Sequence, residues 1–296
     1  MRTSRTARQW AWRAALAALF VSAAPVALAD QIDILFVGNS YTFGAASPAW
    51  KYRADSVTDL NGDGVGGVPA LFKSFTEQRG LDYQVSLETA GGKDLRWHWE
   101  NRAQLLDRAW DHVVLQEYSS IVKARPGDPA DFLAFSRRFA DMFRVRNAGV
   151  QIHLTATWSR PEQIYPAEGA WHGTPIAAQA LALRAEADRA AAASRAAGVL
   201  PVGQAFQRAI DTGFADPNPY DGIAFGQVDL WAWDHYHGSL FGYYLEALIV
   251  FGRVTGQDPR VLGRDEVAGQ DLGLSRDQAE RMQQIAFDTL AAEKRR

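Results

Sequence analysis

Five short apolar runs, separated by segments with helical periodicity, constrain the fold of this chain most strongly. Each run has the length of a buried strand. We expect strands at Ile32–Val37, Tyr83–Leu87, His112–Leu115, Gln151–Ala156 and Val199–Val202. We expect helices at Val68–Gln78, Asp131–Arg146, Thr174–Ala197, Gly238–Val254 and Ser275–Glu293. Strands that alternate with helices indicate a parallel sheet covered on both faces, so the pattern predicts a doubly wound α/β domain.

Two kinds of local signal support the predicted helices. Four phenylalanines recur at helical spacing in the second helix and predict its buried face; they are Phe132, Phe135, Phe139 and Phe143. Gly198 and Gly256 follow the third and fourth helices, where glycine commonly ends a helix in the left-handed conformation. We therefore predict that both glycines are helix C-caps.

The N-terminal segment has the pattern of a secretory signal peptide. Four arginines precede a short apolar stretch, Ala14 to Ala24, and Ala27-Leu28-Ala29 resembles an A-x-A cleavage site. The stretch is interrupted by Pro25 and is too short for a membrane span, although an uncleaved anchor remains the alternative. We expect residues 1–29 to be a signal peptide, residues 30–296 to be one domain, and the mature protein to be secreted or periplasmic without a membrane association.

Charge and cysteine content exclude several classes of function. Cleavage after Ala29 would remove four Arg and no acid, which moves the formal net charge from −3 to −7. Nucleic-acid binding needs clustered Lys and Arg, so an acidic mature protein is not expected to bind nucleic acid. The chain contains no Cys, which excludes disulfides, thiolate catalysis and cysteine-based zinc sites.

The first predicted strand ends on a small polar triplet, Gly38-Asn39-Ser40, in the stretch "ILFVGNSYTFG". Ligands of doubly wound sheets bind outside the carboxyl ends of the strands, near the point where the strand order reverses. Ser40 therefore stands where a catalytic nucleophile can stand. An ordinary turn would also account for the triplet.

A second polar group lies near the other end of the chain, in "WAWDHYHGS". Asp234 and His237 are three residues apart, just before a long apolar helix. A serine hydroxyl needs a base to take its proton, and an imidazole oriented by a carboxylate supplies one. The pattern predicts a Ser40–His237–Asp234 triad. The alternative is that Asp234 caps the helix and His237 is a surface residue.

Groups that could stabilise an oxyanion follow the second and third predicted strands. A glycine pair in "ETAGGKDL" allows backbone N–H groups to approach a developing negative charge, and Gln116 in "VVLQEYSS" carries an amide donor. We predict an oxyanion hole formed by the N–H groups of Ser40 and Gly92 and by the Gln116 side chain. Tight turns and capping are the alternatives for both segments.

These blocks, in this order, resemble the SGNH (GDSL-like) hydrolase superfamily over nearly the whole mature chain. "ILFVGNSYTFG" is similar to its first block with Gly-Asn-Ser for Gly-Asp-Ser, "AGGKDL" to its second, and "DHYH" to its Asp-x-x-His block. The third block departs, because Gln116-Glu117 stands where the superfamily has Gly-x-Asn-Asp, as in a branch with "GNS" and "LQE". The resemblance implies a flavodoxin-like three-layer α/β/α sandwich with a five-stranded parallel sheet, and a serine esterase without a cofactor or metal.

The expected substrate is a small ester or an acylated glycan. O-acetyl groups on a glycan would suit an exported enzyme with many aromatic residues, and Asn39 and Trp158 at strand ends are predicted to contact the substrate. A lipid or short-acyl esterase is the alternative within the enzyme class, and a non-catalytic carbohydrate-binding module is the alternative outside it. An α/β-hydrolase is disfavoured because residue 42 is Thr, which breaks the Gly-x-Ser-x-Gly elbow.

Two further features have more than one interpretation. Asp59, Asn61 and Asp63 in "DLNGDG" match the start of a calcium loop, but Ala70 stands where a bidentate acid is required, so a turn is the favoured interpretation. His98, on a helix near the second block, is interpreted as a partly buried structural residue. The spacing of His172 and His235 supports no metal site.

Overall fold

The computed structural model describes residues 31–120 and 127–294. The predicted signal peptide lies outside the described residues and stays a prediction. Within the described ranges, no helix has the length and apolar content to cross a membrane. The strands are β1 (Ile32–Gly38), β2 (Thr58–Asp59), β3 (Tyr83–Thr89), β4 (His112–Gln116), β5 (Gln151–Ala156) and β6 (Gly198–Pro201). The α-helices are α1 (Gly67–Gln78), α2 (Leu95–Leu106), α3 (Pro129–Arg146), α4 (Pro161–Ile164), α5 (Ala177–Ser194), α6 (Val202–Asp211), α7 (Leu240–Thr255), α8 (Val267–Asp271) and α9 (Arg276–Glu293).

The six strands form one parallel sheet in the order β2-β3-β1-β4-β5-β6. The predicted α/β architecture is confirmed, but the predicted five strands are corrected to six. The missed strand, β2, has only two residues and lies in a polar segment without an apolar run. The strand order reverses beside β1, because the chain places β3 on one side of it and β4 on the other. The loop after β1 therefore lies at the switch point.

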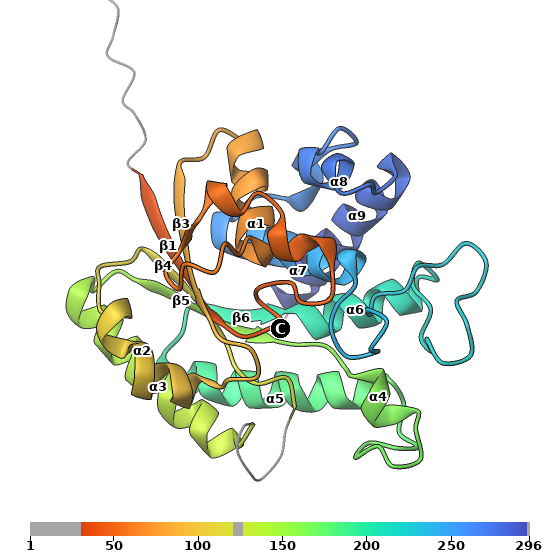
Figure 1. Ribbon diagram of the computed structural model, residues 1–296, viewed down its shortest axis with the longest axis horizontal. Coiled ribbons are helices and arrows are strands. Elements are labelled where there is room, and N and C mark those ends of the chain that lie inside the picture. Colours follow the sequence, from red (N-terminus) through yellow and green to blue (C-terminus); the bar gives the residue numbers. More distant parts are fainter. Residues whose placement is uncertain (1–30, 121–126, 295–296) are drawn as a thin grey trace, which may run out of the picture. The chain divides into compact units, whose positions relative to one another are not determined.

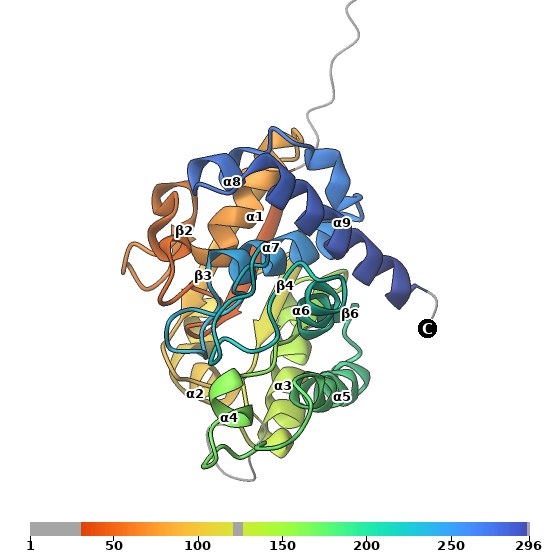
Figure 2. The ribbon, with the colours of Figure 1, turned by 90° about the vertical axis from the view of Figure 1, so that its right-hand side faces the viewer.

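Alternate side chains of β1 reach the two faces of the sheet, as the geometry of a strand requires. Ile34 and Phe36 join one buried cluster, and Leu35 and Val37 join the other. Helices α1, α7, α8 and α9 lie on one side of the sheet, and α2, α3 and α5 lie on the other (Figures 1 and 2). Both faces are covered, which explains why the centre of β1, residues 34–37, is apolar without alternation.

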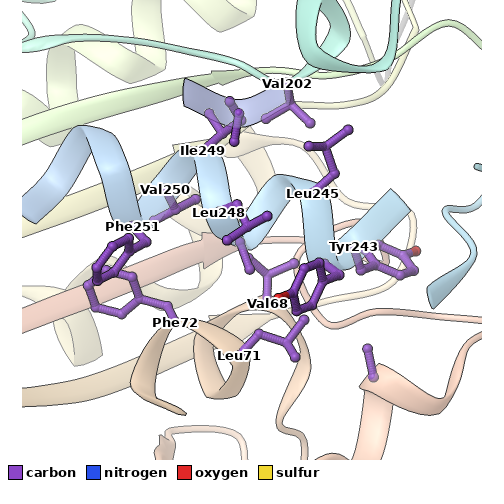
Figure 3. Close-up of a cluster of buried hydrophobic side chains, with 14 of the residues drawn as sticks. Val68, Leu71, Phe72, Val202, Tyr243, Leu245, Leu248, Ile249, Val250 and Phe251 are labelled. Carbon is purple, nitrogen blue, oxygen red and sulfur yellow. The ribbon is translucent and has the colours of Figure 1, made fainter. Parts of the chain in front are cut away.

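Helix α7 lies inside the first of these layers. Its residues are apolar almost all round because it packs against the sheet, α1, α6 and α9. Figure 3 shows Leu245, Leu248 and Phe251 of α7 with Val68 and Phe72 of α1 in one buried cluster. The N-terminus of α7 is capped by Ser239, whose hydroxyl accepts from the N–H groups of residues 241 and 242. The segment with Asp234 and His237 precedes this cap and is thereby tied to a buried helix.

The predicted helix boundaries are confirmed at some ends and wrong at others, most of all in α5, which is three residues shorter at each end than the predicted Thr174–Ala197. All four phenylalanines predicted for α3 are buried, Gly256 has φ +70 at the end of α7, and Ser275 forms a capping box at the start of α9. The predicted C-cap Gly198 instead begins β6, and α5 ends earlier, with Arg195 in the left-handed conformation at φ +53. The alanine-rich sequence around this end contains no breaker that would locate it.

Candidate active site

The loop after β1, residues 39–43, is held by buried hydrogen bonds from the neighbouring strand. The Gln116 side-chain oxygen accepts from the Asn39 N–H at 2.9 Å and from the Thr42 hydroxyl at 3.0 Å. Gly38 precedes the loop, and a Cβ there would lie 2.1 Å from the Thr42 hydroxyl oxygen, so only glycine fits. We call residues 39–43 the nucleophile loop. Its Ser40 is 6% exposed.

The turn after β3 lies beside the nucleophile loop, as the predicted second block requires. The Ala90 N–H donates to the Gly38 carbonyl at 3.0 Å, and the Asn39 side-chain amide donates to the Lys93 carbonyl at 2.9 Å. Gly92 is exposed and has φ +68, which favours glycine. Asn39 itself is 2% exposed, so its side chain connects two loops; a direct contact with a substrate, as predicted, is not supported by this burial.

Gln116 is wholly buried and its contacts face inward. Its side-chain nitrogen donates to the Glu117 carbonyl, while its oxygen holds the nucleophile loop. These contacts do not support the predicted role of Gln116 as an oxyanion donor. They make it a positioning residue for the backbone on either side of Ser40.

Residues 232–238, which we call the base loop, bring Asp234 and His237 together. His237 Nδ1 lies 2.6 Å from Asp234 Oδ2, and Asp234 Oδ1 accepts from the N–H groups of Tyr236 and His237. Burial opposes ionisation of Asp234, but the hydrogen bonds from His237 outweigh it and lower the pKa of Asp234. Asp234 thus caps its own turn, and Ser239 rather than Asp234 caps α7.

The two loops meet through aromatic residues. The Tyr41 hydroxyl donates to the Tyr236 carbonyl at 2.9 Å, and the Tyr41 ring centroid lies 5.8 Å from that of His237. The Tyr236 ring lies against His237, with 3.9 Å between the two ring centroids. His237 Nε2 is buried and has no hydrogen-bond partner within the described ranges, and no hydrogen bond there joins it to Ser40. Catalytic hydrogen bonds often form only when substrate binds, so this geometry is compatible with a triad.

Trp158 is buried completely and packs against the base loop. Its ring stacks between Tyr41, at 4.3 Å, and Phe206, at 4.7 Å, and its Nε1–H donates to the Tyr236 carbonyl at 3.3 Å. A side chain with no exposed surface cannot form a wall open to substrate, so the predicted substrate contact is not supported. The prediction placed Trp158 correctly after β5. The direction of its side chain is set by its neighbours Tyr41 and Phe206, which the sequence pattern does not identify.

Sequence analysis missed Tyr236 and Arg160. The Arg160 guanidinium lies 3.9 Å from the Tyr236 ring centroid, donates to the Ser119 hydroxyl at 3.3 Å and forms a 2.5 Å salt bridge with Glu162. Burial raises the pKa of the Tyr236 phenol, and the charge of the Arg160 guanidinium and the nearby Ser40 side chain offset this rise only in part. Tyr236 directly precedes the predicted base His237, and this position could have identified it as a site residue. No sequence pattern marks Arg160 as a site residue.

Glu117 provides a buried carboxyl at the carboxyl end of β4. Its oxygens accept from the N–H groups of Leu95 and Tyr118. Burial raises the pKa of Glu117 to about 8, and the nearby Asp94 carboxyl adds to this rise. The carboxyl is therefore mostly protonated at neutral pH, so it adds little negative charge to this edge of the sheet.

The remaining predicted site residues serve the structure around the site. Asp59 accepts from the N–H groups of residues 61, 63 and 65, which favours the turn over the calcium loop. No group of three or more His, Cys, Asp or Glu side chains in residues 31–120 and 127–294 is arranged to hold a metal ion. His98 is completely buried and pairs with Glu88 at 2.5 Å, and His235 adopts φ +54.

Solved structures with the same fold are available for comparison. A DUF4886 family protein from Bacteroides uniformis has a TM-score of 0.57 at 16% identity, over 89% of this chain and 96% of that one. A candidate GDSL-like lipase from Parabacteroides merdae has a TM-score of 0.53 at 16% identity, over 76% and 96%. A member of the lipolytic G-D-S-L family from Veillonella parvula has a TM-score of 0.51 at 12% identity, over 76% and 100%. No family model and no curated protein matches the sequence. These likenesses show a shared fold, so the resemblance predicted from the motifs is confirmed at that level.

Proposed function

We propose that this chain is an exported serine esterase of the SGNH type. One observation carries the proposal: a histidine bonded to a carboxylate at 2.6 Å sits in a loop that contacts the nucleophile loop, through Tyr41, at the switch point of the sheet. Doubly wound sheets bind ligands at this point. The fold shared with lipolytic G-D-S-L proteins agrees with the proposal.

The proposed reaction uses two transfers of the acyl group. Ser40 Oγ attacks the ester carbonyl while His237 Nε2 takes its proton, and the carbonyl oxygen becomes an oxyanion. The alcohol then leaves with the proton from His237, and an acyl-enzyme remains. Water attacks the acyl-enzyme in the same way, with His237 as the base, and releases the acid and free Ser40. Asp234 holds the imidazole in the tautomer with Nδ1 protonated and stabilises the imidazolium. The N–H groups of Ser40 and Gly92 are the proposed backbone donors to the oxyanion.

The proposed substrate is an O-acetyl group on a glycan, released in the periplasm or outside the cell. The predicted signal peptide and the aromatic residues at the sheet edge support this proposal. Trp233 is 82% exposed beside Asp234, and Tyr220 contacts His235 at a ring distance of 4.3 Å, so rings are available at the rim for a sugar. A lipid or short-acyl ester is the second candidate in the same mechanism.

Hydrolysis of p-nitrophenyl acetate and butyrate by the purified protein tests the proposal. We expect turnover that is lost in Ser40→Ala and His237→Ala and kept in His172→Ala, a matched control at an exposed histidine. The ratio of the two rates reports the acyl-length preference, and release of acetate from an acetylated oligosaccharide tests the glycan.

Two results would contradict the proposal. Turnover that survives Ser40→Ala would rule out the assigned nucleophile. Saturable binding of a sugar without turnover of any ester would favour a carbohydrate-binding module that uses the same edge of the sheet.

A further inference from the structure

The imidazole of the proposed base is held at one nitrogen by Asp234 and along its ring by Tyr236. His237 Nδ1 lies 2.6 Å from Asp234 Oδ2, and the ring centroids of His237 and Tyr236 are 3.9 Å apart. One hydrogen bond at one ring nitrogen does not fix the tilt of the ring. The place of Nε2 therefore depends on the packing of the Tyr236 ring, and so on whatever holds that ring.

Arg160 holds the Tyr236 ring. Its guanidinium carbon lies 3.9 Å from the ring centroid, which is within the range of a cation–π contact. The guanidinium is itself fixed on two sides. Its Nη1 donates to the Ser119 hydroxyl at 3.3 Å, and its Nε and Nη2 contact Glu162 Oε1 at 2.7 and 2.5 Å. The Arg160 side chain is 12% exposed, so little water screens these contacts.

The backbone beside Arg160 contacts the base loop one residue earlier. The Glu162 N–H donates to the His235 carbonyl at 3.3 Å. His235 has φ +54, a conformation that costs free energy for a residue with a side chain and persists only where its surroundings hold it. The Arg160 N–H donates at 2.6 Å to the side-chain oxygen of Gln179, which lies on α5 and is wholly buried. This anchored segment thus contacts the two residues that directly precede the proposed base.

We propose that Arg160 is a positioning residue, which holds the His237 imidazole, through the Tyr236 ring, at the tilt that proton transfer requires. His237 Nε2 must come within hydrogen-bond reach of the Ser40 hydroxyl to take its proton. A misplacement of about 1 Å lowers the rate of such a step by about 10²-fold. Removal of Arg160 should therefore slow the proton transfer and leave ester binding intact. The inference rests on the proposed esterase function.

The substitution Arg160→Met tests the inference because it keeps an unbranched side chain and removes the charge and the N–H donors. We expect kcat for p-nitrophenyl acetate to fall by about 10–10²-fold with KM little changed. The rate at which a fluorophosphonate labels Ser40 should fall by a similar factor, because labelling uses the same base. Arg160→Lys keeps a cation beside the ring, so its kcat should lie between those of the native protein and Arg160→Met.

Arg184→Met is the matched control. Arg184 is also buried, but its ionic partners, Asp188 and Glu293, lie on α5 and α9 rather than in the base loop. It should lose stability in urea denaturation and retain the native kcat. A loss of kcat as large as that of Arg160→Met would overturn the inference, because reduced stability would then account for both variants.

A double-mutant cycle tests whether Arg160 acts through Tyr236. Tyr236→Leu removes the ring and should lower kcat by a factor similar to that of Arg160→Met. The double variant should be no slower than the slower single variant, because the second substitution removes a contact that is already lost. Multiplied losses in the double variant would overturn the inference. Arg160→Lys takes the place of Arg160→Met in the cycle if the latter does not fold.

The remaining outcomes separate the inference from the proposed function. An unchanged kcat in Arg160→Met would overturn the inference and leave the esterase intact. A raised KM with an unchanged kcat would also overturn it, because the guanidinium would then contact the substrate. No Ser40-dependent turnover in the native protein would instead overturn the proposed function.

Discussion

The nucleophile loop and the base loop reach the same site but are held by different forces. Hydrogen bonds from Asn39 to the Gln116 side-chain oxygen, at the end of β4, and to the Lys93 carbonyl, in the turn after β3, fix the nucleophile loop. The base loop rests on the stacked rings of Trp158 and Tyr41, and it includes a non-glycine residue at φ +54 and a tryptophan that is 82% exposed. The first loop is thus positioned by the sheet itself. The second is positioned by contacts between segments far apart in the sequence.

The largest expected effect is on the chemistry of the base loop. Asp234→Asn should lower kcat by about 10⁴, because an amide favours the wrong imidazole tautomer and does not stabilise the imidazolium. The remaining side-chain oxygen can still accept from the N–H groups of residues 236 and 237, so thermal unfolding should change little. Steady-state hydrolysis of p-nitrophenyl acetate measures kcat. A loss of less than tenfold would contradict the triad.

Trp158, which packs under the base loop, should contribute more to the stability of the fold than the exposed aromatic residue of this loop. Trp158→Ala should lower the free energy of unfolding by about 3–5 kcal/mol, because it leaves a cavity between Tyr41 and Phe206. Urea denaturation measures this change. Trp233→Ala is the control within the same loop and should change stability by less than about 0.5 kcal/mol, because its ring is exposed. Equal effects of the two substitutions would refute the contrast between supporting and rim aromatics.

The nucleophile loop should depend on polar contacts instead. Gln116→Leu leaves the Asn39 N–H and the Thr42 hydroxyl without their buried acceptor, at a cost of about 1–3 kcal/mol for each group. Thr42→Val removes one donor and should cost only about 1 kcal/mol. Urea denaturation compares the two variants. A loss of kcat in Gln116→Leu without a loss of stability would instead restore the predicted oxyanion role of Gln116.

A further expected effect is the pH dependence of stability at the end of β4. Burial raises the pKa of Glu117 from 4.5 to about 8. Its protonated form stabilises the fold below pH 4.5, and this contribution is lost as the pH rises from 4.5 to about 8, at up to about 1.4 kcal/mol per pH unit. Glu117→Gln cannot ionise, so it should gain stability relative to the native protein over this range. Denaturation at pH 5 and pH 8 measures the difference, and an unchanged difference would show that Glu117 ionises normally.

The fold was predictable because its signals are local. Short apolar runs located five strands, and the phenylalanines of α3 and the glycine after α7 located helices without knowledge of their partners. The short strand β2 was not predictable, because its two residues pair only through the backbone of β3. The end of α5 was missed for a related reason, since Arg195 rather than a glycine adopts the left-handed conformation there.

The sequence by itself determined which residues end the strands of the sheet, because strand and turn preferences act over a few neighbouring residues. This placed Ser40, Gly92 and Gln116 at one edge and put Asp234 three residues from His237. Only the tertiary structure decided where these side chains point. Gln116 and Trp158 face inward because their hydrogen-bonding and stacking partners come from distant segments, and Tyr236 lies beside His237 while Tyr41 and Trp158 hold its backbone carbonyl. Such contacts depend on packing in three dimensions, and a local sequence pattern does not predict them.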